Sequence, residues 1–323
     1  MERVLITGAD GFVAAHLIKE IQSQYGGISI TGVGLKESPS CTRTIDYLML
    51  DITDYEAIKE LIEEKKPDSV FHLAALPSVA LSWDDPWSTY RVNVLGQVNL
   101  MEALRRLEIE ASVHIACSSE EYGKVAPETM PITESLPFNP CSHYAVSKVA
   151  QEVLGLMYHQ AFDWRVIVTR GFNHTGPGQS PDFVVSSFAH QIAEIEANLR
   201  EPVIMVGNLE AKRDFLDVRD VVRAYRMIME KGKPGSAYNV CSGQAHPISE
   251  LLDILLEISG MEIRVEQDAC RQRPSDIPLL LGDNTRLRRE TGWEPEIPIE
   301  KTLADSLDYW RSMVGKAAQG PQG

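Results

Sequence analysis

The chain has 323 residues, which is enough for two domains or for one large domain with a smaller lobe attached. Hydrophobic residues make up 44% and charged residues 24%, which excludes a collagen, a coiled coil or a disordered chain and indicates a soluble globular protein. The net charge of −15, with no polybasic run, argues against general binding to nucleic acid or to a membrane surface, so we expect a few local cations to hold any anionic ligand.

The first half of the chain alternates short apolar runs with apolar residues at helical spacing. The string Thr53-x-x-Glu56 is typical of a capping box and predicts the start of one helix. Such alternation predicts right-handed crossovers and a parallel sheet buried on both faces, so we expect an α/β fold with a doubly wound parallel sheet of the Rossmann type. The expected elements are strand 4–7, helix 13–21, strands 29–33 and 47–50, a helix after residue 53, strand 69–73, helix 94–101 and strand 112–117.

The second half predicts a smaller C-terminal lobe. A turn-rich segment at 173–181 precedes an apolar helix, which indicates that the chain leaves the first domain there. We expect that domain over 1–170, with a return at about 211–243, and the lobe over 171–210 and 244–314, followed by a frayed tail at 315–323. The expected elements are helix 142–160, strand 165–169, helix 184–199, strand 203–206, a helix after residue 220, strand 238–241, a helix from 249 and a last helix around 303–310.

Neither a membrane span nor a metal centre is indicated by the sequence. No apolar stretch approaches the roughly 18 residues that a span needs, and the first apolar segment does not resemble the core of a signal peptide. The five cysteines are never spaced Cys-x-x-Cys and the histidines show no ligand spacing, so we expect no disulfide framework and no metal. These features predict a cytoplasmic protein.

A glycine turn lies directly between the first predicted strand and the first predicted helix. Gly8 and Gly11 stand where a parallel sheet presents the N–H groups of a helix N-terminus to a pyrophosphate, and Ala14 at the third position still permits close packing of helix on strand. The turn predicts a dinucleotide site, and an ordinary strand-turn-helix is the alternative.

The end of the second strand bears on the choice of cofactor. Enzymes that prefer NAD usually place an acid there for the ribose 2′-hydroxyl, but here no carboxylate appears before Glu37. Lys36 and Arg43 are suited to a 2′-phosphate, so we expect NADPH, with NADH possible. The alternative is that both are solvated surface cations.

Tyr144 and Lys148 lie one helical turn apart on the same predicted helix face. An ammonium beside a phenol stabilises the phenolate, so we expect the pKa of Tyr144 to be lowered towards neutrality. The predicted strand 112–117 ends at Ser118 and Glu120, which places a hydroxyl and a carboxylate at the carboxyl edge of the sheet, where ligands bind in this architecture.

With these motifs in this order, the chain resembles the extended short-chain dehydrogenase/reductase family over nearly its whole length. The resemblance implies that Ser118 hydrogen-bonds the reacting sugar oxygen, that Tyr144 exchanges its proton, and that Lys148 holds the nicotinamide ribose and tunes Tyr144. The matching segments are Asp51-Ile52, His72-Leu-Ala-Ala75, Asn93-Val-x-Gly96, Ser118-Ser-x-x-Tyr-Gly123, Tyr144-x-x-x-Lys148, Asn173-x-x-Gly-Pro177, Arg213-Asp-Phe-x-Asp-Val218 and Arg273-Pro274.

The same resemblance implies further contacts. Asp51 and Ile52 would line the adenine pocket, and Asn93 would support the active-site helix. Arg213 and Arg273 would clamp the pyrophosphate of a nucleotide sugar, and the alternative is a salt bridge to a nearby aspartate. The remaining expected cofactor contacts are Phe12, Val13, Leu73, Ala74 and Ala75, and the remaining substrate contacts are Ser119, Asn173, Phe183 and Val184.

Glu120 leaves two chemistries open. In the sugar-nucleotide 4,6-dehydratases a glutamate at this position removes a proton next to a transient ketone. Four longer strings, 118–123, 172–180, 206–215 and 238–243, are instead similar to reductases of GDP-4-keto-6-deoxy sugars, and the arginine pairs typical of GDP-mannose dehydratases are replaced here by Leu35-Lys36 and Gly178-Gln179.

The resemblance therefore implies reduction of the C4 ketone of GDP-4-keto-6-deoxy-D-mannose to a GDP-6-deoxy-hexose, with GDP-D-rhamnose as first choice. A dehydratase or a 4-epimerase is the alternative. The resemblance also implies a homodimer that forms through the helices near 86–107 and 142–160.

Overall fold

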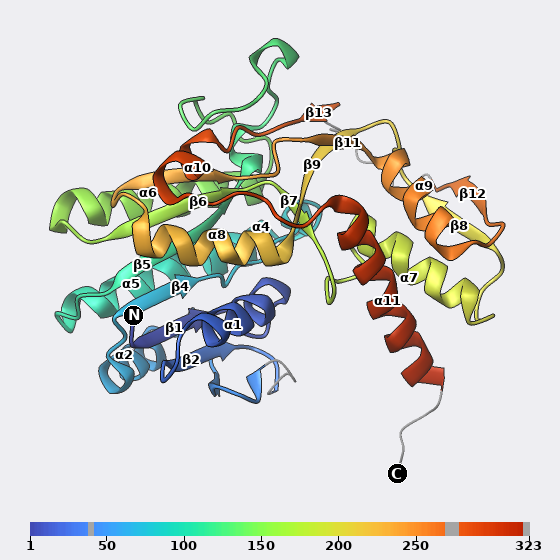
Figure 1. Cartoon of the computed structure of the whole chain (residues 1–323). Helices are drawn as coiled ribbons and strands as arrows, with labels where there is room; N and C mark the ends of the chain where they lie inside the picture. The colour runs from blue at the N-terminus through green and yellow to red at the C-terminus, as the bar shows by residue number, and fades with distance from the viewer. Residues whose placement is uncertain (38–41, 269–277, 319–323) are drawn as a thin grey trace.

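A seven-stranded parallel sheet forms the core of the computed structural model, which describes residues 1–37, 42–268 and 278–318 (Figure 1). Every pair of neighbouring strands in it is parallel. The doubly wound sheet predicted from the sequence is confirmed. Its strand order is β10 (Ser236–Val240), β6 (Val166–Gly171), β5 (Ser112–Ser118), β4 (Ser69–His72), β1 (Arg3–Thr7), β2 (Ser29–Gly34) and β3 (Asp46–Met49).

Helices cover both faces of this sheet, and alternate strand residues point to opposite faces. Val4 and Ile6 of β1 pack with α1 (Phe12–Gln24) and α8 (Val218–Lys231). Leu5, between them, packs with the other set of helices, which are α2 (Tyr55–Lys65), α5 (Gly96–Arg106) and α6 (His143–Phe162). The strands are therefore apolar at nearly every position because both faces are buried.

A second group of elements builds a smaller lobe, at the right of Figure 1, with its own apolar core. The helices α7 (Val184–Glu196), α9 (Ile248–Ser259) and α11 (Ile299–Ala318) pack together beside the two-stranded sheet of β8 (Val203–Val206) and β12 (Arg264–Gln267). A four-stranded sheet contains β11 (Ala245–Pro247), β9 (Lys212–Asp217), β13 (Leu279–Leu280) and β7 (Asn173–Thr175).

Some elements differ from the sequence-based expectation. Helix α2 is capped by Asp54, whose side chain accepts a hydrogen bond from the N–H of Ala57, and not by Thr53. Strand β9 was not predicted because Lys212–Asp217 is mostly charged, and it joins the four-stranded sheet, whereas α8 and β10, which follow it, belong to the central sheet and its covering helices. Helix α11 continues to Ala318, into the segment predicted as a frayed tail.

The chain also forms short helical segments around the site. They are α3 (Leu81–Asp84), α4 (Pro86–Tyr90), a π-helical turn at Arg91–Leu95, 3₁₀ turns at Ser119–Tyr122 and Pro127–Thr129, and α10 (Thr285–Thr291). Of the helices in the described ranges, none combines the length and the apolar character that crossing a membrane requires.

Candidate active site

The glycine turn at the carboxyl end of β1 forms a cradle that only glycine fits. Gly8 has φ +70°, and a Cβ on it would lie 2.8 Å from the backbone nitrogen of Ala74. Thr7 fixes the facing loop, because its Oγ1 accepts a hydrogen bond from the N–H of Ala74 at 3.2 Å. Gly11 is the N-cap of α1 and supplies no side chain to cap it, so the N–H groups of Phe12 and Val13 are directed at the cradle. These features fit a dinucleotide pyrophosphate.

An acid within the glycine turn organises the end of β2. The Asp10 carboxylate accepts hydrogen bonds from the N–H groups of Leu35 and Lys36, each at 3.1 Å. The hydroxyl of Tyr47 donates to the carbonyl of Lys36 at 2.6 Å. The backbone of Lys36 is thus fixed beside the cradle, and its side chain is exposed, as is that of Arg43. The residues between, 38–41, lie outside the described part of the chain.

Asp51 and Ile52 follow β3 on the same side of the site. Ile52 is buried, and its Cδ1 would lie only 2.4 Å from a Cβ on Gly96. Its carbonyl accepts a hydrogen bond from the side-chain amide of Asn99 at 3.0 Å, whereas Asp51 is exposed. Leu73, Ala74 and Ala75 follow β4 and are half-buried.

Ser118, Tyr144 and Lys148 come together at the carboxyl end of β5. The hydroxyls of Ser118 and Tyr144 are hydrogen-bonded to each other. The Nζ of Lys148 lies 5.9 Å from the centre of the Tyr144 ring and donates to the carbonyl of Ala116 at 2.8 Å. All three side chains are at most 9% exposed, so their chemistry takes place away from bulk water.

The expected lowering of the pKa of Tyr144 is wrong for this structure. Burial raises the pKa of the phenol well above its usual value, and the nearby Glu120 raises it further, although the hydrogen bond from Ser118 opposes the change. Burial likewise lowers the pKa of Lys148. The site therefore holds Tyr144 as a neutral phenol, which is the form that donates a proton.

Asn93 connects the loop after β4 to the helix that carries Tyr144. Its amide donates to the hydroxyl of Ser147 at 2.9 Å, and Ser147 in turn donates to the carbonyl of Tyr144 at 2.7 Å. Its side-chain oxygen accepts from the N–H of Leu76 at 2.8 Å. Asn93 lies in the π-helical turn at Arg91–Leu95, a rare local structure that is frequent at functional sites.

Glu120 lies in the 3₁₀ turn that follows Ser118, and its N–H donates to the hydroxyl of Ser118 at 3.2 Å. Its side chain is half-buried and close enough to Tyr144 to raise the pKa of the phenol. Ser119, its neighbour in the same turn, is buried. Glu120 is thus beside the candidate reacting groups.

The candidate substrate contacts lie on the smaller lobe and at its border. Asn173 on β7 and Arg213 on β9 occupy adjacent strands of the four-stranded sheet. Asp214, next to Arg213, accepts hydrogen bonds from the N–H groups of Ser242, Gly243 and Gly282. Phe183, at the N-cap of α7, is 39% exposed and Val184 is half-buried. Arg273 lies outside the described residues.

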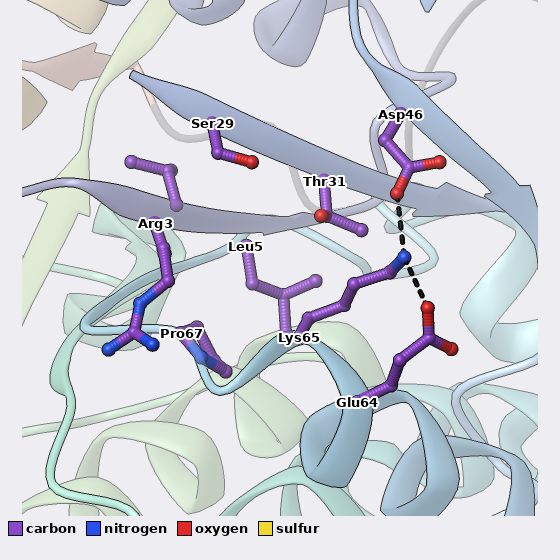
Figure 2. A pocket seen from close by; sticks show the side chains of 9 residues that line it. Arg3, Leu5, Ser29, Thr31, Asp46, Glu64, Lys65 and Pro67 are labelled. Atoms are coloured by element: carbon purple, nitrogen blue, oxygen red, sulfur yellow. Dashed lines mark hydrogen bonds and ion pairs between the residues drawn. The ribbon is translucent and has the colours of Figure 1, made fainter. Parts of the chain in front are cut away.

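A separate surface hollow of about 220 Å³ lies at the opposite edge of the sheet (Figure 2). It is lined by residues from the amino ends of the first strands, including Arg3, Ser29 and Asp46. Lys65 points to Asp46 and Glu64, with ion pairs of 2.8 Å and 2.7 Å (Figure 2). Because the ammonium of Lys65 is neutralised by two acids, we do not assign an anion site to this hollow.

Sequence reasoning missed several residues that shape the site. Asp10 and Ser147 are ordinary polar residues in the sequence, and only the fold brings them to the turn and to Asn93. Glu121 carried a signal that was not used, since Ser118-x-x-Glu121 has the spacing of a capping box, and the structure contains that capping box.

Comparisons with known proteins agree with this geometry. A sequence profile of the GDP-mannose 4,6 dehydratase family matches residues 5–306. The chain is 37% identical over 313 residues to GDP-6-deoxy-D-mannose reductase of Pseudomonas aeruginosa, covering 97% of this chain and 98% of that protein. It is 29% identical to GDP-mannose 4,6 dehydratase 2 of Arabidopsis thaliana, covering 94% and 85%. The solved structure of RMD from Pseudomonas aeruginosa complexed with NADPH superposes with a TM-score of 0.87 at 35% identity, covering 97% and 100%.

Proposed function

The chain belongs to the GDP-mannose 4,6-dehydratase family, and we propose that it is an NADPH-dependent reductase of GDP-4-keto-6-deoxy-D-mannose. The product is a GDP-6-deoxy-hexose, GDP-D-rhamnose. The observation that carries the proposal is the buried Tyr144, hydrogen-bonded to Ser118 and beside Lys148. The similarity of the chain to a GDP-6-deoxy-D-mannose reductase and to a structure with NADPH supports the substrate class and the cofactor.

The residues of the site divide the reduction into two tasks. Bound NADPH supplies the hydride that C4 of the sugar accepts. Ser118 donates a hydrogen bond to the ketone oxygen, and Tyr144 gives its proton to the alkoxide as that oxygen becomes negative. The resulting phenolate is stabilised by the Lys148 cation and regains a proton from solvent. Hydride and proton together convert the ketone to an alcohol, so atoms and charges balance.

The cofactor is held by the cradle and the end of β2. The N–H groups of Phe12 and Val13 would hold the pyrophosphate, since the N–H of Gly11 already donates to the carbonyl of Gly8 at 2.9 Å, and Asp51 and Ile52 would line the adenine pocket. Lys36 and Arg43 would meet the 2′-phosphate. The surroundings of the nicotinamide ribose would be completed by Leu73, Ala74, Ala75 and Asn93. The nucleotide sugar would be contacted by Ser119, Asn173, Phe183, Val184 and Arg213.

Glu120 supports a second candidate, a GDP-mannose 4,6-dehydratase. A carboxylate beside Tyr144 is placed to remove a proton next to a ketone formed at C4. The replacement of the arginine pairs argues against the dehydratase. Gln179 stands where one of those arginines is expected, and it is buried with its side chain hydrogen-bonded to Thr175. In the reductase Glu120 binds substrate hydroxyls.

The test mixes the purified protein with GDP-4-keto-6-deoxymannose or with GDP-mannose, each with NADPH or NADH, and follows nicotinamide absorbance together with product mass. We expect oxidation of the cofactor with the keto sugar only. Loss of water from GDP-mannose without net consumption of cofactor would contradict the reductase and make Glu120 a catalytic base.

Replacing Lys36 with alanine should raise KM for NADPH roughly tenfold and leave KM for NADH within about twofold, because only NADPH carries the 2′-phosphate that the cation meets. Steady-state kinetics with both cofactors measures this. Lys59→Ala, on the surface of α2, is the control and should change neither KM. Equal losses with both cofactors would show that Lys36 acts through loop structure and not through the phosphate.

We also propose that the protein works in the cytoplasm as a homodimer that forms through α6 and the segments beside it. Val146, Val153 and Met157 are 40%, 53% and 43% exposed, and their spacing puts them on one face of α6. Trp87 of α4 and Leu95 extend this apolar surface, at 79% and 47% exposed. Sedimentation equilibrium should give twice the mass of the chain, and a single-chain mass would contradict the dimer.

A further inference from the structure

A buried cluster of three charged side chains lies directly beneath the catalytic end of β5. Glu121, Glu152 and Arg170 are 0%, 1% and 5% exposed. Arg170, on β6, donates to both oxygens of Glu152 at 2.9 Å and 2.6 Å. The other guanidinium nitrogen, Nη1, donates to the hydroxyl of Tyr122 and to the carbonyl of Glu134, so the cation is largely committed to partners other than Glu121.

Glu121 is the excess acid of this cluster. Its Oε2 is 3.5 Å from the Nε of Arg170, which already serves Glu152, and that oxygen is buried with no hydrogen-bond donor among the residues that the structure describes. Two ionised carboxylates held by one guanidinium would leave this buried cluster with a net negative charge. Burying such an uncompensated charge is costly.

A single proton on Glu121 would neutralise the excess negative charge and give the unpaired Oε2 a hydrogen bond. A protonated Oε2 donates a hydrogen bond to Glu152, with which Glu121 interacts through its side chain. The other oxygen, Oε1, remains an acceptor and receives the N–H of Ser118 at 3.4 Å. Burial and the neighbouring Glu152 carboxylate act in the same direction, and they raise the pKa of Glu121 well above its usual value.

We propose that Glu121 is a positioning residue that stays protonated at neutral pH, shares its proton with Glu152, and so holds the backbone of Ser118 in its working place. The importance of Ser118 in this statement rests on the proposed function. The capping box explains the coupling, because the same carboxyl closes the 3₁₀ turn whose other end is the Ser118 hydroxyl. A loose Ser118 would misplace the donor that polarises the ketone.

The other groups facing Glu121 do not offer a better account. The sulfur of Cys117 and oxygens of both carboxylates lie within 4.8 Å of one another, but the guanidinium of Arg170 brings a positive charge to the place that a metal would need. The titratable and charged neighbours of Glu121 are Cys117 on β5, Tyr144, Lys148 and Glu152 on α6, Arg170 on β6, Glu134 in the loop before α6, and Glu120 and Tyr122 on its own turn.

Two substitutions separate the roles of the proton and of the acceptor. In Glu121→Gln the amide donates to Glu152 and its oxygen accepts from Ser118, which imitates the protonated acid. In Glu121→Leu both hydrogen bonds are lost. We expect Glu121→Gln to keep kcat within about twofold, and Glu121→Leu to lose roughly ten- to a hundredfold in kcat with KM for NADPH unchanged.

Infrared difference spectroscopy of the wild type against Glu121→Gln, on unliganded protein at neutral pH, should show the carbonyl stretch of a protonated carboxylic acid in the wild type only. This readout needs no turnover. Its absence would overturn the protonation state whatever the kinetics show.

The melting temperature gives a second readout that is independent of the reaction. A pKa raised by folding means that the folded chain binds the proton more tightly, so this contribution to stability is complete below the usual pKa of the acid and is lost as pH rises towards the folded-state pKa. The melting temperature of the wild type should therefore fall by several degrees relative to that of Glu121→Gln between pH 5 and pH 8. Parallel pH curves for the two proteins would contradict the proposal.

The outcomes distinguish this proposal from the proposed function. If no keto sugar is reduced by the wild type, the proposed function fails, and the infrared band and the melting curves still decide whether Glu121 is protonated. If the wild type is active and Glu121→Leu, with an unchanged circular dichroism spectrum, keeps full kcat, the positioning role is overturned. If Glu121→Gln loses as much kcat as Glu121→Leu, the neutral acid is not the working form.

Discussion

Replacing Tyr144 with phenylalanine should lower kcat by about 10² to 10⁴ while the affinity for NADPH stays within about twofold. The substitution removes one oxygen from a side chain that is 9% exposed, so packing in α6 changes little. What is lost is the proton donor and the hydrogen-bond partner of Ser118. Without that donor the alkoxide at C4 has to take its proton from water, from which the buried site is shielded.

Stopped-flow measurement of a single turnover reports the chemical step, and fluorescence titration reports NADPH binding. Tyr158→Phe is a matched control on the same helix, because its hydroxyl also makes one hydrogen bond, to Glu102 at 2.7 Å, but Tyr158 lies 14 residues after Tyr144, near the other end of α6. It should leave kcat unchanged. Unchanged turnover in Tyr144→Phe would remove Tyr144 from the mechanism.

The candidate catalytic residues could be named from the sequence because each belongs to a local pattern. Gly8 follows a β-branched run, Ser118 ends another, and Tyr144 and Lys148 are separated by one helical turn. The rule that ligands bind at the carboxyl edge of a parallel sheet then joins these separate segments. For the same reason the doubly wound sheet itself followed from the alternation of strands and helices.

Long-range electrostatics was not predictable in this way. The proposed proton on Glu121 depends on Glu152 from α6 and Arg170 from β6, which no local period relates to Glu121. The pKa of Tyr144 was predicted in the wrong direction because the sequence shows the neighbouring Lys148 but not the depth of burial, and burial dominates. Strand β9 was missed since its charged residues carry no alternation that marks a strand.

The direction of the Tyr144 shift has a mechanistic meaning. A phenol that ionised easily would already have lost its proton when the ketone arrives, and would then repel the growing negative charge at C4. In the proposed reduction, burial favours the protonated form of Tyr144 before the reaction, and the buried Lys148 would stabilise the phenolate that forms.

Gly123→Ala should destabilise the protein by more than about 4 kcal/mol or prevent folding, a magnitude reserved for severe steric or electrostatic faults. Gly123 ends the catalytic 3₁₀ turn with φ 60° and ψ −137°, a conformation that side chains avoid. An added Cβ would lie 1.7 Å from the carbonyl oxygen of Asn139. That residue cannot simply move, because its N–H donates to the carbonyl of Glu121 at 2.9 Å.

The matched control is Gly260→Ala at the end of α9, where φ is +65° and nothing lies within 4 Å of the added Cβ. This variant should lose only the free energy that a left-handed backbone costs an alanine, about 1 kcal/mol. Urea unfolding followed by circular dichroism compares the two midpoints. If both variants lost the same stability, the contact with Asn139 would be irrelevant and the backbone conformation alone would explain the glycine. A far larger loss for Gly123→Ala would show that the loop at Asn139 is locked against the turn that carries Ser118 and Glu120, the candidate reacting residues.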